Sequence, residues 1–261
     1  MPFPLRPSHR PLLFAHRGAS AHAPENTLAA FKLAETLGAD GIECDVQLSA
    51  DGHLIIHHDR VLGRTEQARG RVQDLDFALL RSLDVGSWFD PAYRHERMPT
   101  PEELVDSLDE HTLINFDVVN DSPRLVGLEA AIVRFFRRLD LFDRAMVSSF
   151  NPLSLWVIRR MEPRITIGLI WADFLPWWLR GPWWRRWLRP DALHPACDLV
   201  TPELVAHAHA RGQRVHVWTV NKPADIARMM ARQVDMIMGD WVDRLRQAAE
   251  MAGQETAAPY R

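Results

Sequence analysis

The feature that most constrains this chain is a regular alternation of short apolar runs with amphipathic stretches, continuing almost from end to end. Alternation of this kind predicts βαβ units arranged around a parallel sheet. Eight runs fit strands: Leu12–His16, Gly41–Leu48, Leu54–His58, Leu113–Val119, Ala145–Ser149, Ile165–Ile170, Val215–Val220 and Asp235–Met238. A ninth short run, Asp198–Val200, leaves the count uncertain by one. We predict an α/β fold, a (β/α)8 TIM-type barrel, with an open doubly wound sheet as the alternative.

The length and composition agree with one soluble domain. A single barrel commonly fills about 250 residues, and this chain has 261. We predict a single barrel domain over 1–261, with an inserted subdomain at 60–99 after the third strand and a Trp-rich insert at 171–195. The net charge of −3 gives no electrostatic reason to expect nucleic acid as a partner. The oligomeric state is left open.

The number of cysteines and the lengths of the apolar runs indicate in which compartment of the cell the protein is expected. The two cysteines, Cys44 and Cys197, are too few for a disulfide framework and favour a reducing compartment. The first residues lack the apolar segment of a secretory signal, and no apolar run is long enough to span a bilayer. We therefore expect a cytoplasmic protein.

Two predicted strands carry carboxylates on one face. Side chains alternate along a strand, so Ile42, Cys44 and Val46 share the apolar face and Glu43 and Asp45 lie on the other. The next strand places Asp117 on its polar face in the same way. Three carboxylates facing a barrel axis require cations, which Arg17 and a divalent metal would supply. Ligation by oxygen alone favours Mg²⁺ or Ca²⁺ over zinc.

The second and third runs are joined by a segment too short for a crossover helix. Its Asp-Gly pair predicts a hairpin, and with Asp51 and Gly52 as the loop residues Asp45 lies opposite His58. A shift of one residue would place His57 there instead. His16 ends the first strand. Two histidines beside a metal and an arginine are the groups that phosphodiester hydrolysis needs for proton transfer and charge stabilisation.

In its sequence motifs the chain resembles the glycerophosphodiester phosphodiesterases. The matching motifs cover nearly the whole chain: His16-Arg17-Gly18, Pro24-Glu25-Asn26-Thr27, Glu43-x-Asp45, His58-Asp59 with Leu62 and Arg64-Thr65, Met98-Pro99-Thr100 with Glu102-Glu103-Leu104, Ser148-Ser149-Phe150, and Val215-His216-Val217-Trp218-Thr219-Val220-Asn221. The resemblance implies that His16 and His58 act as general acid and base. It also implies that Glu43, Asp45 and the Asp117 position bind Mg²⁺ or Ca²⁺, that Arg17 grips the phosphate, and that 60–99 is the family's small inserted subdomain.

The fourth predicted strand departs from the family's usual Glu-x-Lys. Asp117 is a shorter but workable ligand, whereas Val119 removes a cation that would face the phosphate. Glu25 and Asn26 are interpreted as scaffolding at a helix start. Trp218 shares a strand face with His216, and if that face points inward Trp218 lines the site against the apolar part of a substrate; core packing is the alternative. The other histidines are interpreted as surface or satisfied polar positions: His53, His57, His95, His111, His194, His207 and His209.

Six of the ten tryptophans fall within 171–187. On a helix beginning at Pro182, Trp183, Trp184, Trp187 and Leu188 share one arc, and Arg185, Arg186 and Arg189 share the opposite arc. Trp with Arg suits a lipid headgroup interface, so one hypothesis is peripheral membrane contact through 174–188. Packing on the barrel or on a second subunit is the other.

Together these features predict metal-dependent hydrolysis of a small-molecule glycerophosphodiester to glycerol 3-phosphate and an alcohol. One alternative keeps the same machinery but takes lysophospholipids at a membrane, as a lysophospholipase D-type hydrolase. Another is a non-catalytic protein that binds a phosphate ligand or a membrane surface on the same barrel.

Overall fold

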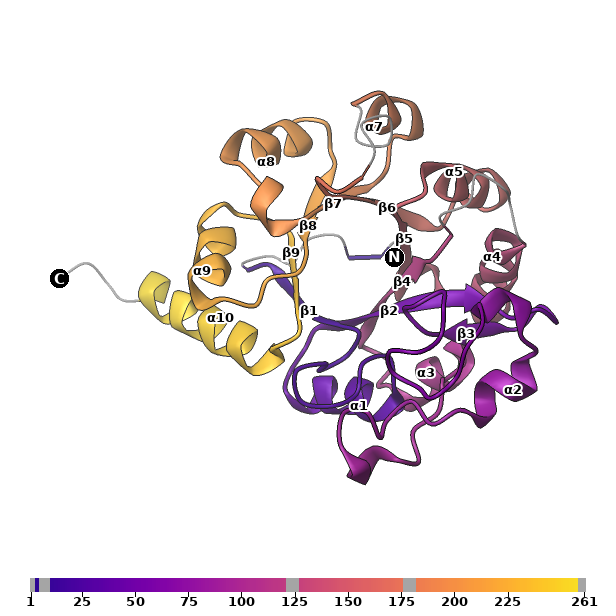
Figure 1. Ribbon diagram of the computed structural model, residues 1–261. Coiled ribbons are helices and arrows are strands. Elements are labelled where there is room, and N and C mark those ends of the chain that lie inside the picture. The colour runs from indigo at the N-terminus through magenta and orange to yellow at the C-terminus, as the bar shows by residue number, and fades with distance from the viewer. Residues whose placement is uncertain (1–2, 5–9, 121–126, 176–181, 258–261) are drawn as a thin grey trace.

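The computed structural model describes residues 3–4, 10–120, 127–175 and 182–257. Within these residues eight parallel strands follow one another around a ring that closes between β1 and β2, in the order β1-β9-β8-β7-β6-β5-β4-β2. Figure 1 shows this ring enclosed by helices. The predicted barrel is therefore confirmed. Its strands are β1 (Leu12–His16), β2 (Gly41–Leu48), β4 (Leu113–Val118), β5 (Ala145–Ser149), β6 (Thr166–Trp171), β7 (Ala192–Pro195), β8 (Arg214–Val217) and β9 (Met236–Gly239).

Helices form the outer layer, and several begin at caps visible in the sequence. Thr100, followed by Pro101, makes a complete capping box with Glu103, while Asn151 and Thr201 each cap a helix whose first residue is proline. The helices are α1 (Leu28–Thr36), α2 (Phe77–Ser82), α3 (Pro101–Ser107), α4 (Leu128–Leu139), α5 (Pro152–Met161), α7 (Pro182–Leu188), α8 (Pro202–His209), α9 (Pro223–Ala231) and α10 (Val242–Ala257).

The list of predicted strands needs three corrections. The third run forms a shorter strand, β3 (Leu54–Ile56), which pairs antiparallel with β2 and takes no place in the ring. The ring is completed instead by β7, at the end of the segment interpreted as a Trp-rich insert. Its Ala-Leu-His-Pro sequence is short and interrupted by a polar residue, so it lacks the apolar run that marks a strand. Asp198–Val200 is not a strand either, because Cys197–Leu199 forms a 3-10 helix.

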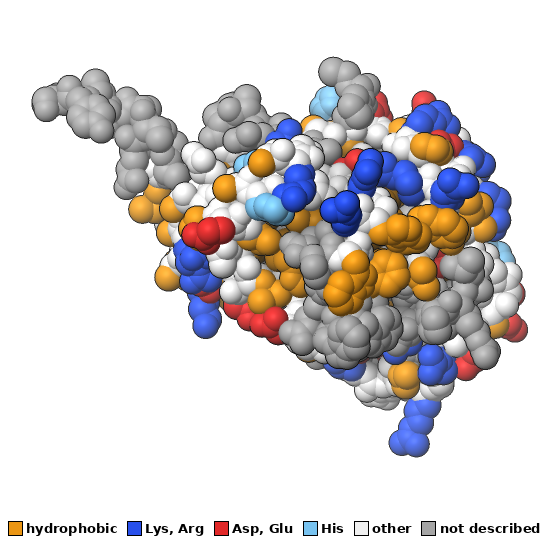
Figure 2. All heavy atoms as spheres, turned by 90° about the horizontal axis from the view of Figure 1, so that it is seen from above, with side chains coloured by type: hydrophobic (Ala, Val, Ile, Leu, Met, Phe, Trp, Pro, Cys, Tyr) orange, Lys and Arg blue, Asp and Glu red, His pale blue; other side chains and the backbone are white. Residues whose placement is uncertain are grey.

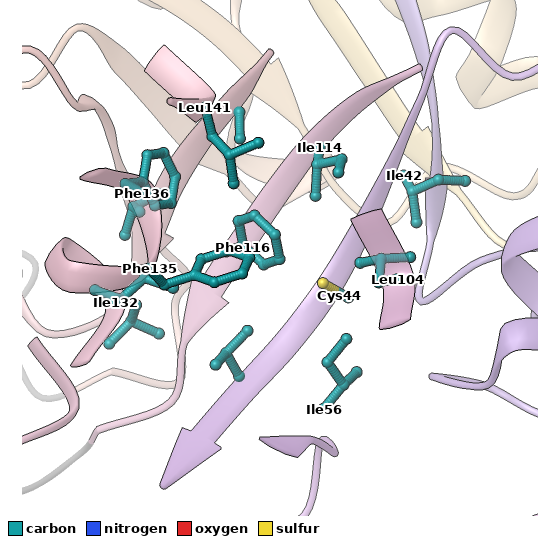
Figure 3. Close-up of a cluster of buried hydrophobic side chains, with 14 of the residues drawn as sticks. Ile42, Cys44, Ile56, Leu104, Ile114, Phe116, Ile132, Phe135, Phe136 and Leu141 are labelled. Atoms are coloured by element: carbon teal, nitrogen blue, oxygen red, sulfur yellow. The ribbon is translucent and has the colours of Figure 1, made fainter. Parts of the chain in front are cut away.

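In β2 and β4, strand periodicity separates an apolar outer face from a polar inner one. The side chains of Ile42, Cys44 and Phe116 are fully buried against the helical layer, where Phe116 meets Phe135 and Phe136 edge to face (Figure 3). Burial of this apolar face fixes the orientation of each strand, since a slip of one residue would turn every side chain to the opposite face. The residues between them therefore point toward the barrel axis.

The segment between β3 and α3 is an insertion in the barrel. It contains α2 and two 3-10 helices, Val72–Asp74 and Pro91–Tyr93, and its apolar side chains gather into a small cluster with Ile55 of β3. We propose to regard 60–99 as a subdomain inserted into one barrel domain. None of the helices in the described ranges has the length and apolar character needed to cross a bilayer.

Candidate active site

The residues selected from the sequence meet in one pocket of about 150 Å³ at the carboxyl ends of the strands. Its lining includes His16, Arg17, Glu43, Asp45, His58, Asp117 and Trp218. Catalytic residues of barrel enzymes lie at this end, because loops from all the strands converge there.

Three carboxylates from two neighbouring strands lie side by side in the pocket. Asp45 of β2 pairs in register with Asp117 of β4, and Glu43 lies two residues before Asp45 on the same face. One oxygen of each lies within 4.8 Å of the others. Burial, followed by the negative charges of Asp45 and Asp117, raises the pKa of Glu43 well above its usual range. Burial and the charge of Asp45 likewise raise the pKa of Asp117.

Arg17 is placed among these carboxylates by a sharp turn after β1. Arg17 has a φ of 57° and Gly18 has a φ of 81°, and a Cβ on Gly18 would lie 2.7 Å from Ala30. In this turn the backbone N–H of Arg17 donates to Glu43 Oε2 at 2.9 Å. The guanidinium lies 3.3 Å from Asp45 Oδ2 and donates to Glu25 Oε1 at 2.9 Å. One positive charge is thus fixed beside the three carboxylates.

Glu25 and Asn26 take part in the site, although the sequence suggested only scaffolding. The Asn26 amide donates to Asp45 Oδ2 at 2.7 Å and so orients that carboxylate. Burial acts to raise the pKa of Glu25, but Arg64 and Arg17 outweigh it and lower that pKa to about 2. The sequence signal for this role was that both residues lie in the motif Pro24-Glu25-Asn26-Thr27.

His16 is oriented by a carboxylate that the sequence analysis missed. Its Nδ1 lies 2.7 Å from Asp240 Oδ1, and Asp240 also accepts from Asn221 at 2.5 Å and from Ser20 at 3.1 Å. Burial opposes ionisation of Asp240, but the hydrogen bond and charge of His16 lower its pKa. Asp240 follows the last barrel strand in a stretch without a recognisable motif, so only the closure of the barrel brings it to His16.

His58 reaches the pocket, although the predicted hairpin register was wrong by one residue. Val46 pairs with Ile56, so Asp45 lies opposite His57, whose backbone N–H donates to Asp45 O at 2.9 Å. The His57 side chain turns away and lies buried 3.7 Å from Glu66. Because β3 ends at Ile56, the chain leaves the sheet and carries His58 into the pocket.

A carboxylate also orients His58. Its Nδ1 lies 2.6 Å from Asp59 Oδ1, and Arg64 donates to the other oxygen of Asp59 at 2.6 Å. Burial opposes ionisation of Asp59, but Arg64 and His58 lower its pKa. His16 and His58 therefore both use Nδ1 for a carboxylate, which leaves Nε2 of each for other chemistry.

Aromatic side chains and a buried histidine form another wall of the pocket. Trp218 lies inside and meets Phe150 edge to face at 5.4 Å, while Phe150 contacts Phe174 at 5.8 Å. Phe174 is 74% exposed, so this row of rings leads from the pocket to the surface. His194 was interpreted from the sequence as a surface or satisfied polar position, but it is buried on β7 and lines the pocket. It lies 3.0 Å from His216, and burial followed by that neighbour lowers the His194 pKa well below its usual range.

Val119 lies apart from the predicted ligands. The strand β4 ends at Val118, and Val119 lines an adjoining groove with Asn120, Arg60 and Arg71 rather than the pocket of Asp117.

The carboxylate cluster has the character of a metal site. In the described part of the chain, Asp117 Oδ1 and the side-chain oxygen of Asn115 are buried without a hydrogen-bond partner. Buried acceptors without donors are unfavourable, and a cation would satisfy them. Glu43, Asp45 and Asp117 could therefore hold a divalent metal.

Comparison with known proteins gives consistent matches. The model of the glycerophosphoryl diester phosphodiesterase family matches residues 16–244. The chain is 37% identical over 234 residues to a glycerophosphodiester phosphodiesterase of Caldanaerobacter subterraneus, covering 88% of this chain and 93% of that protein. A phosphodiesterase of Oleispira antarctica, solved in complex with the product sn-glycerol-3-phosphate, is 28% identical with a TM-score of 0.80, over 92% of this chain and 97% of that one. A structure from Silicibacter pomeroyi, described as a putative glycerophosphoryl diester phosphodiesterase, is 27% identical with a TM-score of 0.84, over 95% and 96%.

Proposed function

The chain belongs to the glycerophosphoryl diester phosphodiesterase family and hydrolyses glycerophosphodiesters to glycerol 3-phosphate and an alcohol, and we propose that His16 and His58 carry the proton transfers of this reaction. The observation that supports this assignment is the matched environment of the two imidazoles. Each binds a carboxylate through Nδ1 at 2.6–2.7 Å, and both line the same pocket.

The proton transfers follow from the tautomers that the carboxylates select. A neutral imidazole that donates Nδ1–H to a carboxylate has a lone pair on Nε2 and can accept a proton from the attacking hydroxyl or water. A protonated imidazole in the same setting donates Nε2–H to the leaving alkoxide and is stabilised by its carboxylate. Asp240 and Asp59 thus act as positioning residues.

We propose that Glu43, Asp45 and Asp117 bind Mg²⁺ or Ca²⁺, because their ligand set consists of carboxylate oxygens. When bound, such a cation polarises a phosphate oxygen and offsets the charge of the carboxylates. Arg17, held beside Asp45 and Glu25, would pair with the phosphate and stabilise the charge that develops on its oxygens.

Single alanine variants test the assignment of the histidines. His16→Ala and His58→Ala should each lower kcat by about 10²- to 10⁴-fold on glycerophosphocholine, because each removes one proton-transfer group. His57→Ala is the matched control, since His57 lies next in sequence but faces Glu66 outside the pocket. Circular dichroism would establish that all three remain folded. Loss of activity in the His57 variant with retention in the His58 variant would contradict the assignment.

The exposed row of rings supports a second substrate class, the lysophospholipids. The pocket of about 150 Å³ has room for a glycerophosphate group, and Phe150 and Phe174 provide an apolar path beyond it. We propose that an apolar chain of the substrate lies along this path. Phe174→Ala should then raise KM for lysophosphatidylcholine about tenfold while leaving KM for glycerophosphocholine unchanged, because burying a side chain of this size contributes about 1.5–3 kcal/mol. An equal effect on both substrates would refute the path.

A further inference from the structure

The helix α7 directs only part of its apolar surface toward the barrel. Leu188 is buried and Trp184 packs against the main hydrophobic cluster, whereas Trp183 and Trp187 are 46% and 50% exposed. Packing on the barrel therefore accounts for Trp184 and Leu188 and leaves Trp183 and Trp187 partly exposed. Within the predicted contact segment 174–188, residues 176–181, which include Trp177 and Trp178, lie outside the described residues.

The neighbouring helix α5 extends the exposed aromatic surface. Trp156 is 40% exposed, and its ring stacks on Trp187 with centroids 5.5 Å apart and planes 23° apart. The guanidinium of Arg160 lies 6.0 Å from the Trp156 ring. Figure 2 looks onto the side of the barrel that carries α7 and α8 and shows hydrophobic side chains gathered beside a row of Lys and Arg. We call the surface formed by Trp156, Arg160, Trp183, Arg186, Trp187 and Arg189 the α5–α7 face.

The charges of the α5–α7 face all have one sign. Neither α5 nor α7 contains an acidic residue, and Arg160, Arg186 and Arg189 are exposed. A groove of about 870 Å³ beside α7 adds Arg211 and His207 to the same side. Of the acidic residues next to this face, Asp191 pairs with Arg159, and Glu162 is buried between Arg137 and Arg164.

We propose that the α5–α7 face docks the protein on the surface of an anionic lipid bilayer. Trp rings combine an apolar body with a polar N–H and favour the headgroup region, while Arg pairs with lipid phosphates. A second copy of this chain fits less well, because a two-fold contact would set the same arginines against each other. The proposal concerns binding and is independent of the proposed catalytic roles.

Vesicle flotation of the full chain tests the proposal. Wild type should float with phosphatidylcholine vesicles that contain phosphatidylglycerol, and less with phosphatidylcholine alone or at high salt. The variant Arg186→Gln/Arg189→Gln should weaken binding about 25-fold, at about fivefold for each charge. The variant Trp183→Ala/Trp187→Ala should weaken it at least about tenfold.

Two matched controls lie outside the α5–α7 face. Leu79→Ala/Trp88→Ala removes comparably exposed apolar side chains, at 49% and 43%, and Arg69→Gln/Arg134→Gln removes two exposed charges. Both control variants should bind vesicles like wild type. Every variant should hydrolyse soluble glycerophosphocholine at the wild-type rate, and this activity would show that each variant is folded. Absence of wild-type binding to anionic vesicles, or equal binding by the Trp183/Trp187 variant, would overturn the proposal. The proposal would also be overturned if wild type were a dimer that does not bind vesicles and the Trp183→Ala/Trp187→Ala variant were a monomer. That result would favour a second copy of this chain as the occupant of the α5–α7 face.

Discussion

The three buried carboxylates should destabilise the metal-free protein and stabilise the metal-bound one. We therefore consider Asp117→Asn, which keeps the shape of the side chain but removes one charge. The carboxylate oxygens of this cluster lie within 4.8 Å of one another, and two unit charges at that distance or closer repel each other by at least about 3 kcal/mol at the effective dielectric of a protein site. Burial and mutual repulsion raise the pKa of Glu43 and Asp117, so protonation already relieves part of this energy.

The expected change can be measured by thermal unfolding in EDTA. We expect Asp117→Asn to raise the free energy of unfolding of the metal-free protein by about 1–3 kcal/mol, and the Tm by about 2–4 °C for each kcal/mol. With Mg²⁺ or Ca²⁺ at a thousand times its dissociation constant, wild type should gain about 4.1 kcal/mol, and the variant should gain much less. The order of stability should therefore reverse on adding metal, and the variant should lose activity.

Glu110→Gln is a suitable control, because the Glu110 side chain is 85% exposed and does not line the pocket of the carboxylates. This variant should behave like wild type with and without metal. The reasoning would be refuted if Asp117→Asn were less stable than wild type in EDTA, or if metal stabilised both proteins equally.

Three further predictions concern the surroundings of the pocket. Asp240→Asn should lower kcat about 10²-fold or more with KM little changed, because His16 would lose the carboxylate that fixes its tautomer; wild-type turnover would disprove this role. The pKa of Glu25 falls from 4.5 to about 2 in the folded protein, so ionised Glu25 stabilises the fold above pH 4.5, and this contribution is lost as the pH falls toward 2. Urea titrations should accordingly show Glu25→Gln destabilised by up to about 3 kcal/mol at pH 6 but close to wild type near pH 2, and a pH-independent difference would contradict the assignment. Gly168→Ala should lower the Tm, since a Cβ there would lie 2.3 Å from His194 Nε2 and overpacking of this kind destabilises by about 1–3 kcal/mol; an unchanged Tm would mean that His194 moves freely.

The local predictions succeeded where the physical rule depends on neighbours in sequence. The alternation of Ile42, Glu43, Cys44 and Asp45 fixes which side chains turn inward, because only one register buries the apolar set. The caps at Thr100, Asn151 and Thr201 are likewise properties of a few consecutive residues. These features were sufficient to predict the barrel and seven of the residues that line its pocket.

The predictions that failed concern pairing between strands, which the periodicity of apolar and polar residues along one strand does not encode. β7 is four residues long and is recognised as a strand only by its pairing with β6 and β8. The hairpin register shifted by one residue, and His58 reached the pocket because the chain leaves the sheet after Ile56.

From the sequence, side-chain alternation places Glu43, Asp45 and Asp117 on the inner face of a barrel, because the burial of their apolar neighbours is a local property. Which groups orient these carboxylates and the two histidines depends on the tertiary structure. Asp240 meets His16 across 224 positions, and Asn26 meets Asp45 across 19. Such pairs form where barrel closure and the left-handed backbone of Arg17, Gly18 and Asn26 bring loops together, and the free energy of that closure is distributed over the whole core.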